Sequence, residues 1–234
     1  MAVPHIALLN FHGDPNLGLH GVATDKFCLI GNCVREHDIK KISEVLQVPV
    51  FIVNLYGTDL VGLFAVANSS AVLLPEIIYP SELKHLRAEL SKLGVKVFTL
   101  KTEHTAFGNN ILLNDKAGIL STVYDKKTVA QIKKFFPEVK FEQVDIAGLS
   151  IPGSAGKVTN NGGIFNPNLS DADIAQVEKL FGFEIGLGTV NFGNPFVSSG
   201  FIANSFGLLA GANSSGYETA RVDESLGFLK LPNT

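Results

Sequence analysis

Five similar segments decide the fold of this chain: VATDKFCLIG (22–31), VANSSAVLLP (66–75), LNDKAGILS (113–121), VTNNGGIFNP (158–167) and IANSFGLLAG (202–211). Each segment has an apolar run, a polar pair and a second apolar run, which is the pattern of two strands joined by a tight turn. Asn, Asp and Gly suit such turns because they form local hydrogen bonds or tolerate positive φ. The sequence therefore predicts five hairpins.

The segments align when one polar position of each is placed in a common column. The residues in that column are Thr24, Asn68, Asn114, Asn160 and Asn204, at intervals of 44, 46, 46 and 44 residues. Small residues stand six positions before the column, at Gly18, Gly62, Gly108, Ser154 and Ser198. A small residue at a repeated position indicates a close approach of two backbones, as near a shared axis.

The pattern of an amphipathic helix follows each hairpin. Apolar residues recur 15 and 18 positions after the column, as at Leu83 and Leu86, although this spacing is one residue shorter in the fourth copy. The expected N-caps are Ser81, Asp125, Ser170 and Ser215, the last in a capping box with Glu218. Gly94, Gly182 and Gly227 stand just past the expected helix ends, where a left-handed residue closes the last turn.

A further strand pattern follows the first four helices, at 49–56, 95–101, 139–146 and 183–192, and its counterpart in the first unit is HIALLNF (5–11). We therefore expect an α+β fold in a single domain, 1–234, built from five pseudosymmetric strand-strand-strand-helix repeats. Their approximate bounds are 5–48, 49–93, 94–138, 139–181 and 182–228.

Closure of these repeats into a ring is expected from the two chain ends. Neither terminal unit resembles the polar cap that ends an open repeat array. The N-terminal strand is as apolar as the internal copies, so its face must be covered. Covering it with the fifth unit closes the ring.

The composition limits the classes of partner. The 234 residues are 46% hydrophobic and carry 19 basic and 22 acidic side chains, a net charge of −3, so any RNA contact must be local. The N-terminal MAVPHIALLNF lacks the features of a signal peptide, and no run reaches the roughly 18–20 apolar residues of a bilayer span. We expect a cytoplasmic protein with no membrane contact.

The residues that could carry catalysis are few. Cys28 and Cys33 are the candidate nucleophiles, with His20 or His37 as the base, but Cys28 falls at an apolar strand position of the repeat, which favours a core role. His5, His12 and His20 lie close in sequence without a Cys or carboxylate at ligand spacing. We expect no metal, no cofactor and no catalytic residue.

Two short motifs resemble nucleotide-binding loops and fail on spacing. In PGSAGKVT (152–159) only two residues stand between the glycines and Val158 separates the lysine from the hydroxyl, so the backbone cannot wrap phosphates as a phosphate loop does. Gly186 and Gly188 lie within a strand pattern rather than between a strand and a helix. We interpret 152–159 as part of the fourth hairpin.

Longer stretches resemble one known family, the translation initiation factor 6 family of ribosome anti-association factors. They are LVGLFAVANSSAVLLP, TAFGNNILLNDKAGILS, GKVTNNGGIFNP, GTVNFGNP and IANSFGLLAGANSSGYE, with the late VDESLGF. The resemblance covers nearly the whole chain in register with all five units. The chain end LKLPNT is similar to the short archaeal form, without the eukaryotic C-terminal extension.

The resemblance implies a pentein, or β/α-propeller, fold and a binding function without catalysis. Such proteins bind the intersubunit face of the large ribosomal subunit, against a ribosomal protein beside the sarcin–ricin loop, with possible local rRNA contact. They block joining of the small subunit and accompany late maturation of the large one. Release involves a GTPase related to elongation factor 2 and the Shwachman-Diamond protein. A monomer is expected.

The resemblance also implies a set of ribosome-binding residues. By position these are Leu63, Asn68, Asn109, Phe196 and Val197. Leu63 departs from the eukaryotic pattern, which has an arginine there, and this removes the basis for a charged contact.

The alternative function is enzymatic, because the same architecture hosts guanidino-modifying enzymes with a late cysteine nucleophile and a histidine in the central channel. This chain has no cysteine after Cys33 and no histidine after His104. The sequence therefore favours a non-catalytic protein.

Overall fold

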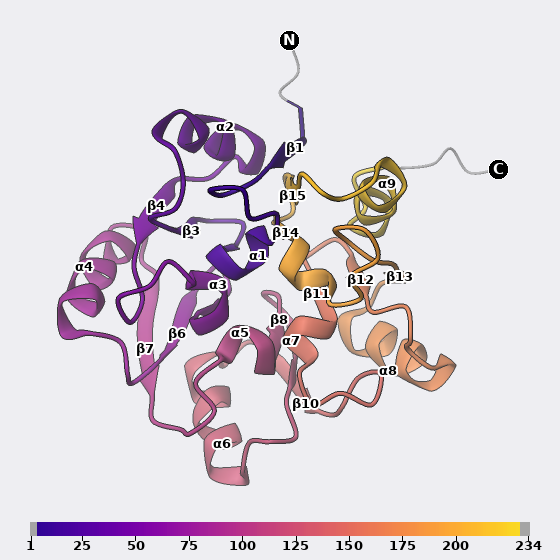
Figure 1. Cartoon of the computed structure of the whole chain (residues 1–234). Coiled ribbons are helices and arrows are strands. Elements are labelled where there is room, and N and C mark those ends of the chain that lie inside the picture. Colours follow the sequence, from indigo (N-terminus) through magenta and orange to yellow (C-terminus); the bar gives the residue numbers. More distant parts are fainter. Residues whose placement is uncertain (1–3, 230–234) are drawn as a thin grey trace.

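The structure of the chain, a computed structural model, describes residues 4–229 and contains five small sheets joined by helices (Figure 1). The chain end LKLPNT, on which the expected short form rests, lies outside the described residues apart from Leu229. None of the helices in this part of the chain has the length and apolar character that a membrane span requires. The architecture is α+β, as expected.

Each sheet has three strands, the first two forming an antiparallel hairpin and the third running parallel to the second. The five predicted hairpins are thus confirmed. The sheets are β2 (Gly21–Ala23), β3 (Cys28–Gly31) and β4 (Val50–Val53); β5 (Val66–Ala67), β6 (Ala71–Pro75) and β7 (Lys96–Leu100); β8 (Ile111–Leu113), β9 (Ala117–Leu120) and β10 (Lys140–Gln143); β11 (Gly156–Val158), β12 (Gly163–Phe165) and β13 (Ile185–Leu187); and β14 (Phe201–Ala203), β15 (Leu208–Gly211) and β1 (Ile6–Leu9).

The third strand of each sheet comes from the neighbouring repeat, so the sheets do not coincide with the sequence repeats. The parallel partner of β15 is β1, from the opposite end of the chain. In β1, Ala7 and Leu9 are buried while Leu8 is half exposed, which is the alternation of a strand with one covered face. The fifth unit therefore pairs with the edge of the N-terminal strand, and the buried side chains of that strand pack with residues of the first and fifth units.

Five longer helices lie at the periphery of the molecule (Figure 1). They are α2 (Glu36–Leu46), α4 (Pro80–Ser91), α6 (Lys126–Phe135), α8 (Asp171–Phe181) and α9 (Gly216–Ser225). Each follows the second strand of its sheet, and the first four lead to the parallel third strand, because a parallel connection needs a crossover. The expected apolar face is buried on each helix, at Ile42, Leu86, Ile132, Val177 and Val222.

Helix ends follow the expected capping chemistry, with one exception. The side chains of Asp125, Ser170 and Ser215 each accept the backbone N–H three residues on. Ser81 is not an N-cap, because α4 begins at Pro80 after the cap Tyr79. Proline suits the first helical position, where it has a preset φ and no N–H is needed.

Five four-residue helices precede the hairpins and were not expected from the sequence. They are α1 (Leu17–His20), α3 (Val61–Phe64), α5 (Phe107–Asn110), α7 (Pro152–Ala155) and the 3₁₀ helix η1 (Val197–Gly200). Each contacts the next in this order, and η1 contacts α1, so that they gather in the middle of Figure 1. The rejected phosphate-loop stretch 152–159 forms α7 and β11, a copy of the other units.

Glycines allow these short helices to meet backbone to backbone. A Cβ atom on Gly62 would overlap the carbonyl oxygen of Gly18, and one on Gly108 would overlap that of Gly62. The expectation that the repeated small residue marks a close backbone approach is confirmed.

The alignment of the fourth repeat was wrong by one residue. The column position bonds its N–H to the carbonyl three residues later, as Asn68 does to Ala71 and Asn114 to Ala117, and in the fourth turn Thr159 does so to Gly162. Thr159, not Asn160, therefore belongs in the column, and Gly153, not Ser154, is the small residue. Thr24 shows that threonine suits the position, and the fourth copy is not short.

Candidate functional site

The short helices form one end of the molecule, which we call the short-helix face: α1, α3, α5, α7 and η1. A hollow of about 360 Å³ opens among them. Its lining residues are Asn16, Gly18, Leu19, Gly62, Asn109, Ile151, Ser154, Asn194, Phe196, Ser198 and Ser199. The lining mixes amide and hydroxyl groups with a few apolar side chains and contains no charged side chain, so it suits a partner recognised by hydrogen bonds and apolar contact.

Four of the five residues implied by the family resemblance lie on or beside this face. Asn109 in α5 and Phe196, the residue before η1, line the hollow, and Leu63 lies in α3. Val197 is 0% exposed and Phe196 is 39% exposed, so of this pair only Phe196 offers surface to a partner.

The first strands of the five sheets, β2, β5, β8, β11 and β14, are called the inner strands. The fifth residue, Asn68, lies at the end of these strands opposite to the short-helix face. It belongs to the turn between β5 and β6, and the five hairpin turns gather there around a smaller hollow of about 30 Å³. Asn68 is 5% exposed, and its side-chain oxygen accepts from the N–H groups of Ser70 and Ala71. Its role in this structure is to hold its own turn.

Phe192 is an exposed aromatic that the sequence reasoning did not single out. It is 78% exposed in a tight turn between Val190 and Asn194, at positive φ. Glu218 accepts hydrogen bonds from the N–H groups of Phe192 and Gly193 and so fixes this turn. Phe192 and Phe196 are the two exposed aromatic residues of NFGNPF (191–196), the segment that leads into η1. Two Phe residues among Asn, Gly and Pro are the feature of the sequence that could have indicated an exposed aromatic segment.

A narrow cavity of about 50 Å³ lies between the two ends of the inner strands. Glycines of the short helices line it together with Lys157 from β11. Burial lowers the pKa of Lys157 to about 8. The space is too small for a typical organic ligand, whose pocket measures roughly 300–1,000 Å³.

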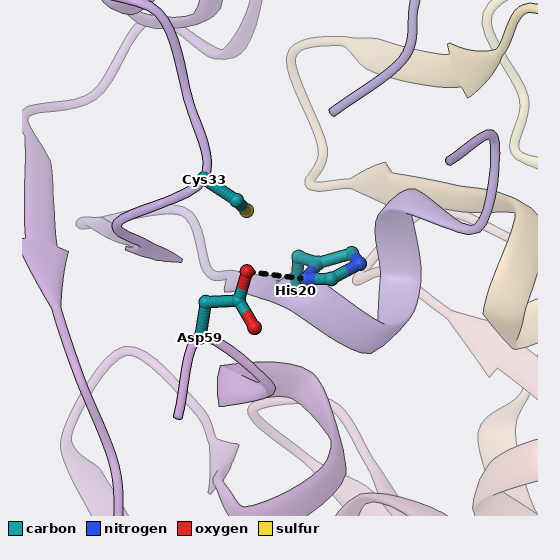
Figure 2. Close-up of side chains that lie close together, drawn as sticks. All are labelled: His20, Cys33 and Asp59. Carbon is teal, nitrogen blue, oxygen red and sulfur yellow. Dashed lines mark ion pairs between the residues drawn. The ribbon is translucent and has the colours of Figure 1, made fainter. Parts of the chain in front are cut away.

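A separate cluster joins the first two units, where His20, Cys33 and Asp59 come together (Figure 2). His20 ends α1, Cys33 follows β3, and Asp59 lies in the loop between β4 and α3. Nδ1 of His20 lies 3.6 Å from Oδ2 of Asp59, and Nε2 lies 3.1 Å from Oδ2 of Asp14. The spacing of these residues along the sequence does not reveal the cluster, because its three members come from three separate segments.

Neither cysteine is poised for nucleophilic attack. Burial raises the pKa of the Cys28 thiol to about 12. Burial also raises the pKa of Cys33 to about 12, with a further contribution from the neighbouring Asp59 carboxylate. A catalytic thiol needs a pKa near or below neutrality, so both remain protonated at pH 7.

Two other histidines considered from the sequence pair with carboxylates elsewhere. His5 contacts Asp223 at 2.9 Å, and His37 lies 3.4 Å from Asp38 on its own helix. Within residues 4–229, the group of possible metal ligands consists of His20, Cys33 and Asp59. The local sequence around the histidines has no Cys or carboxylate at ligand spacing, but the fold brings a thiol and carboxylates to His20.

A repeated fold of five small α+β units defines the structural class of this chain, and a family model described as "eIF-6 family" matches residues 6–225. This match extends from β1 to α9 and thus through all five sheets. The chain belongs to the eIF-6 family.

Curated relatives support this assignment along nearly the whole chain. Translation initiation factor 6 of Pyrococcus horikoshii is 37% identical over 227 residues, covering 96% of this chain and 100% of that protein. Translation initiation factor 6 of Thermococcus onnurineus is 36% identical, with coverages of 96% and 99%. The protein of the same name from Staphylothermus marinus is 32% identical, with coverages of 94% and 97%.

Comparison with solved structures finds two enzymes with low sequence identity and low TM-scores. An agmatine deiminase from C. jejuni shares 16% identity over 55% of this chain and 50% of its own, with a TM-score of 0.39. DDAH from Pseudomonas aeruginosa shares 11% identity over 92% and 74% of the two chains, with a TM-score of 0.39.

Proposed function

We propose that this chain is a translation initiation factor 6 that binds the large ribosomal subunit and prevents its association with the small subunit. The observation that carries the proposal is the family match through residues 6–225, together with relatives of that name along nearly the whole chain. The proposal includes the role in late large-subunit maturation that the family resemblance implies, the cytoplasmic location expected from the sequence, and a monomeric state. Catalysis forms no part of it, since both thiols are buried and protonated at pH 7.

The proposed architecture is that of a pentein, in which the five units close into a rigid ring within one domain. The pairing of β1 with β15 and the contact of η1 with α1 support closure. A rigid body is suited to steric exclusion because it occupies the joining surface without yielding when the small subunit approaches. Docking on a protein patch needs few phosphate contacts, which suits a net charge of −3 and implies a shallow salt dependence.

The short-helix face is the proposed docking surface, on a ribosomal protein beside the sarcin–ricin loop. Asn109 offers hydrogen-bonding groups in the hollow, Phe196 offers exposed apolar area in its lining, and Phe192 is exposed in the turn that precedes Phe196. Leu63 adds an apolar side chain from α3. Exposed aromatic side chains held by rigid turns are typical anchors of protein interfaces. From the family resemblance, the proposal also includes release of the chain from the large subunit by an elongation factor 2-like GTPase and the Shwachman-Diamond protein.

Subunit joining tests this function directly. The purified protein should co-sediment with large subunits in a sucrose gradient and reduce the yield of joined ribosomes when small subunits are added. Phe196→Ala should weaken large-subunit binding about tenfold or more, as loss of an interface anchor does, and Asn109→Arg should weaken it by inserting a bulky charge. Tyr217→Ala is the matched control, because it removes an 82% exposed aromatic from the outer helix α9.

Undiminished subunit joining at saturating protein would refute the proposed function. If joining is blocked but Phe196→Ala and Tyr217→Ala bind equally well, the function stands and the docking face is wrong. Thermal melting of each variant verifies that the fold is intact.

A further inference from the structure

We propose that His20, Cys33 and Asp59 form a zinc-binding site that joins the first and second units of the fold (Figure 2). Nδ1 of His20, Sγ of Cys33 and one carboxylate oxygen of Asp59 are the proposed ligands. Nitrogen, sulfur and oxygen atoms of these residue types are the ligands that zinc takes in proteins. Zinc binds cysteine as the thiolate, so formation of the Zn–S bond displaces the proton of Cys33, which passes to solvent. Three protein ligands leave the fourth tetrahedral position for water.

The ligand atoms already lie near coordination distance from one another. All three lie within 4.8 Å of each other, and the Nδ1–Oδ2 distance between His20 and Asp59 is 3.6 Å. Two ligand atoms about 2.0–2.1 Å from a tetrahedral zinc ion are about 3.3 Å apart. With the longer Zn–S bond, Sγ and a nitrogen or oxygen ligand are about 3.6 Å apart, so side-chain shifts of about 1 Å would complete the geometry around an ion.

Nδ1 of His20 forms no hydrogen bond within the described part of the chain. His20 is 7% exposed, and its Nδ1 is a buried polar atom without a hydrogen-bond partner among the described residues. A buried polar atom with no hydrogen-bond partner destabilises the folded state. In Figure 2, Cys33 and Asp59 lie on the same side of the imidazole, and the dashed line joins Asp59 to Nδ1, so Nδ1 faces the other two members of the cluster.

Asp14 holds the imidazole in the orientation that a metal requires. Its Oδ2 lies 3.1 Å from Nε2 of His20, and its Oδ1 accepts from the backbone and side-chain N–H groups of Asn16. If Nε2–H donates to Asp14, Nδ1 carries a free lone pair. A carboxylate on the distal nitrogen is the usual partner of a metal-binding histidine.

The local charge also favours a cation. Asp14 and Asp59 are both acidic, and the ion pairs that they form in the described part of the chain involve only His20. Lysine and arginine do not pair with either carboxylate in that part of the chain. A divalent ion would balance the negative charge of these two carboxylates.

The repeat itself does not demand this cluster. The positions that correspond to His20 in the later units, four before the column, are Phe64, Asn110, Ala155 and Gly200. Those that correspond to Cys33 are Ile77, Val123, Asn168 and Asn213. Because the other four units fold without a histidine or a thiol at these places, the cluster is an addition to the first unit.

Cobalt substitution tests the site, because Co²⁺ adopts zinc geometry and its bond to a thiolate gives a near-ultraviolet charge-transfer band. The full chain, purified without a metal-binding tag and stripped with chelator, should develop this band on addition of one equivalent of Co²⁺, and Zn²⁺ should abolish it. Cys33→Ala should lose the band. Cys28→Ala is the matched control, since Cys28 is equally buried and corresponds to Gly118 and Gly163 in other units, and it should retain the band.

Zinc affinity and the zinc-induced shift in melting temperature distinguish a specific site from nonspecific metal binding. Zn²⁺ should raise the melting temperature of the wild-type chain but not of Asp59→Asn, because a ligand that binds only the folded state stabilises it. Asp14→Asn should weaken zinc binding about 10–100-fold while keeping the thiolate band, as loss of an outer hydrogen bond does.

Absence of the band in the wild-type chain would overturn the proposal, and so would its persistence in Cys33→Ala. If Cys33→Ala does not fold, the melting comparison decides, and an equal zinc-induced shift in wild type and Asp59→Asn overturns the site. These readouts do not depend on ribosome binding, so they are independent of the proposed function.

Discussion

Gly62 shows how a single missing side chain sets the geometry of the short-helix face. Its α-carbon faces the carbonyl oxygen of Gly18 so closely that a Cβ would overlap it, and Gly108 stands in the same relation to Gly62. The contact is between backbones, which cannot move aside as a side chain can. Any side chain at these positions must therefore push neighbouring units apart.

Gly62→Ala should destabilise the fold by about 3 kcal/mol or more, as overpacking against rigid backbone does. Gly216→Ala is the control, because a Cβ at Gly216 meets nothing within 4 Å and the change should alter stability by less than about 0.5 kcal/mol. Urea denaturation of the two variants and the wild type measures both effects. Equal unfolding midpoints would show that the short helices can separate at little cost.

Single residues also show where prediction from the sequence reached its limit. The small residues at Gly18, Gly62 and Gly108 were readable because they recur at a fixed interval. His20, Cys33 and Asp59 were not readable as a group, because their separations match no local motif and only the packing of α1 against α3 unites them. The choice of Asn160 over Thr159 failed because the column was matched by residue type, whereas the turn requires a hydrogen-bonding pattern that threonine also satisfies.

At the scale of elements, each of two helices carries a glutamate that accepts hydrogen bonds from the backbone of a turn distant in sequence. Glu82 of α4 accepts from the N–H groups of Tyr56 and Gly57, and Glu218 of α9 accepts from those of Phe192 and Gly193. Both carboxylates also cap their own helix. The long helices, strands and most caps were predictable because each carries a periodic signal, but the four-residue helices were not, since one turn is too short to show a period.

Glu218 should make stability depend on pH. Burial alone would raise the pKa of its carboxyl group, but hydrogen bonds from the backbone of Ser215 and Gly193 and from Thr189 outweigh burial and lower the pKa. Because the folded-state pKa lies below the unfolded one, the stabilisation is present above about pH 4.3, the unfolded value, and is lost as the pH falls through the folded value.

Glu218→Gln should therefore lower the free energy of unfolding by about 2 kcal/mol at pH 7, where a charged acceptor is lost. The difference from the wild type should shrink as the pH falls below 4. Urea denaturation across this pH range measures it. A difference that is constant with pH would mean that shape rather than charge holds the turn.

At the scale of the whole molecule, β1 supplies the parallel strand of the fifth sheet. Its register pairs Leu9 with Gly211, and β14 of the same sheet contacts β2 of the first. The sequence predicted contact between the N-terminal strand and the fifth unit, because an apolar strand needs cover, but it did not predict that this strand completes the fifth sheet. The two hollows at opposite ends of the inner strands could not be foreseen, since they depend on how five units pack together.

Leu9→Ala should cost about 2–5 kcal/mol, the usual range for a buried leucine. Leu8→Ala, in the same strand, should cost little, because Leu8 is 50% exposed and Leu9 only 6%. Hydrogen exchange of the amides in β15 should accelerate in Leu9→Ala alone. Similar exchange in both variants would argue against the covered face of β1.

The pairing of β1 with β15 also constrains the order in which the protein can be made. Ile6 pairs with Leu208, 202 positions later, so the first strand to leave the ribosome finds its partner only when synthesis is nearly complete. The four sheets from β2 to β13 can form in order as they emerge, whereas the N-terminal strand stays unpaired and apolar until the end. Contacts so distant in sequence fold slowly, and an unpaired strand is prone to aggregation. We therefore expect fastening of the N-terminal strand to be the last and slowest folding step, the one at which a molecular chaperone would matter most.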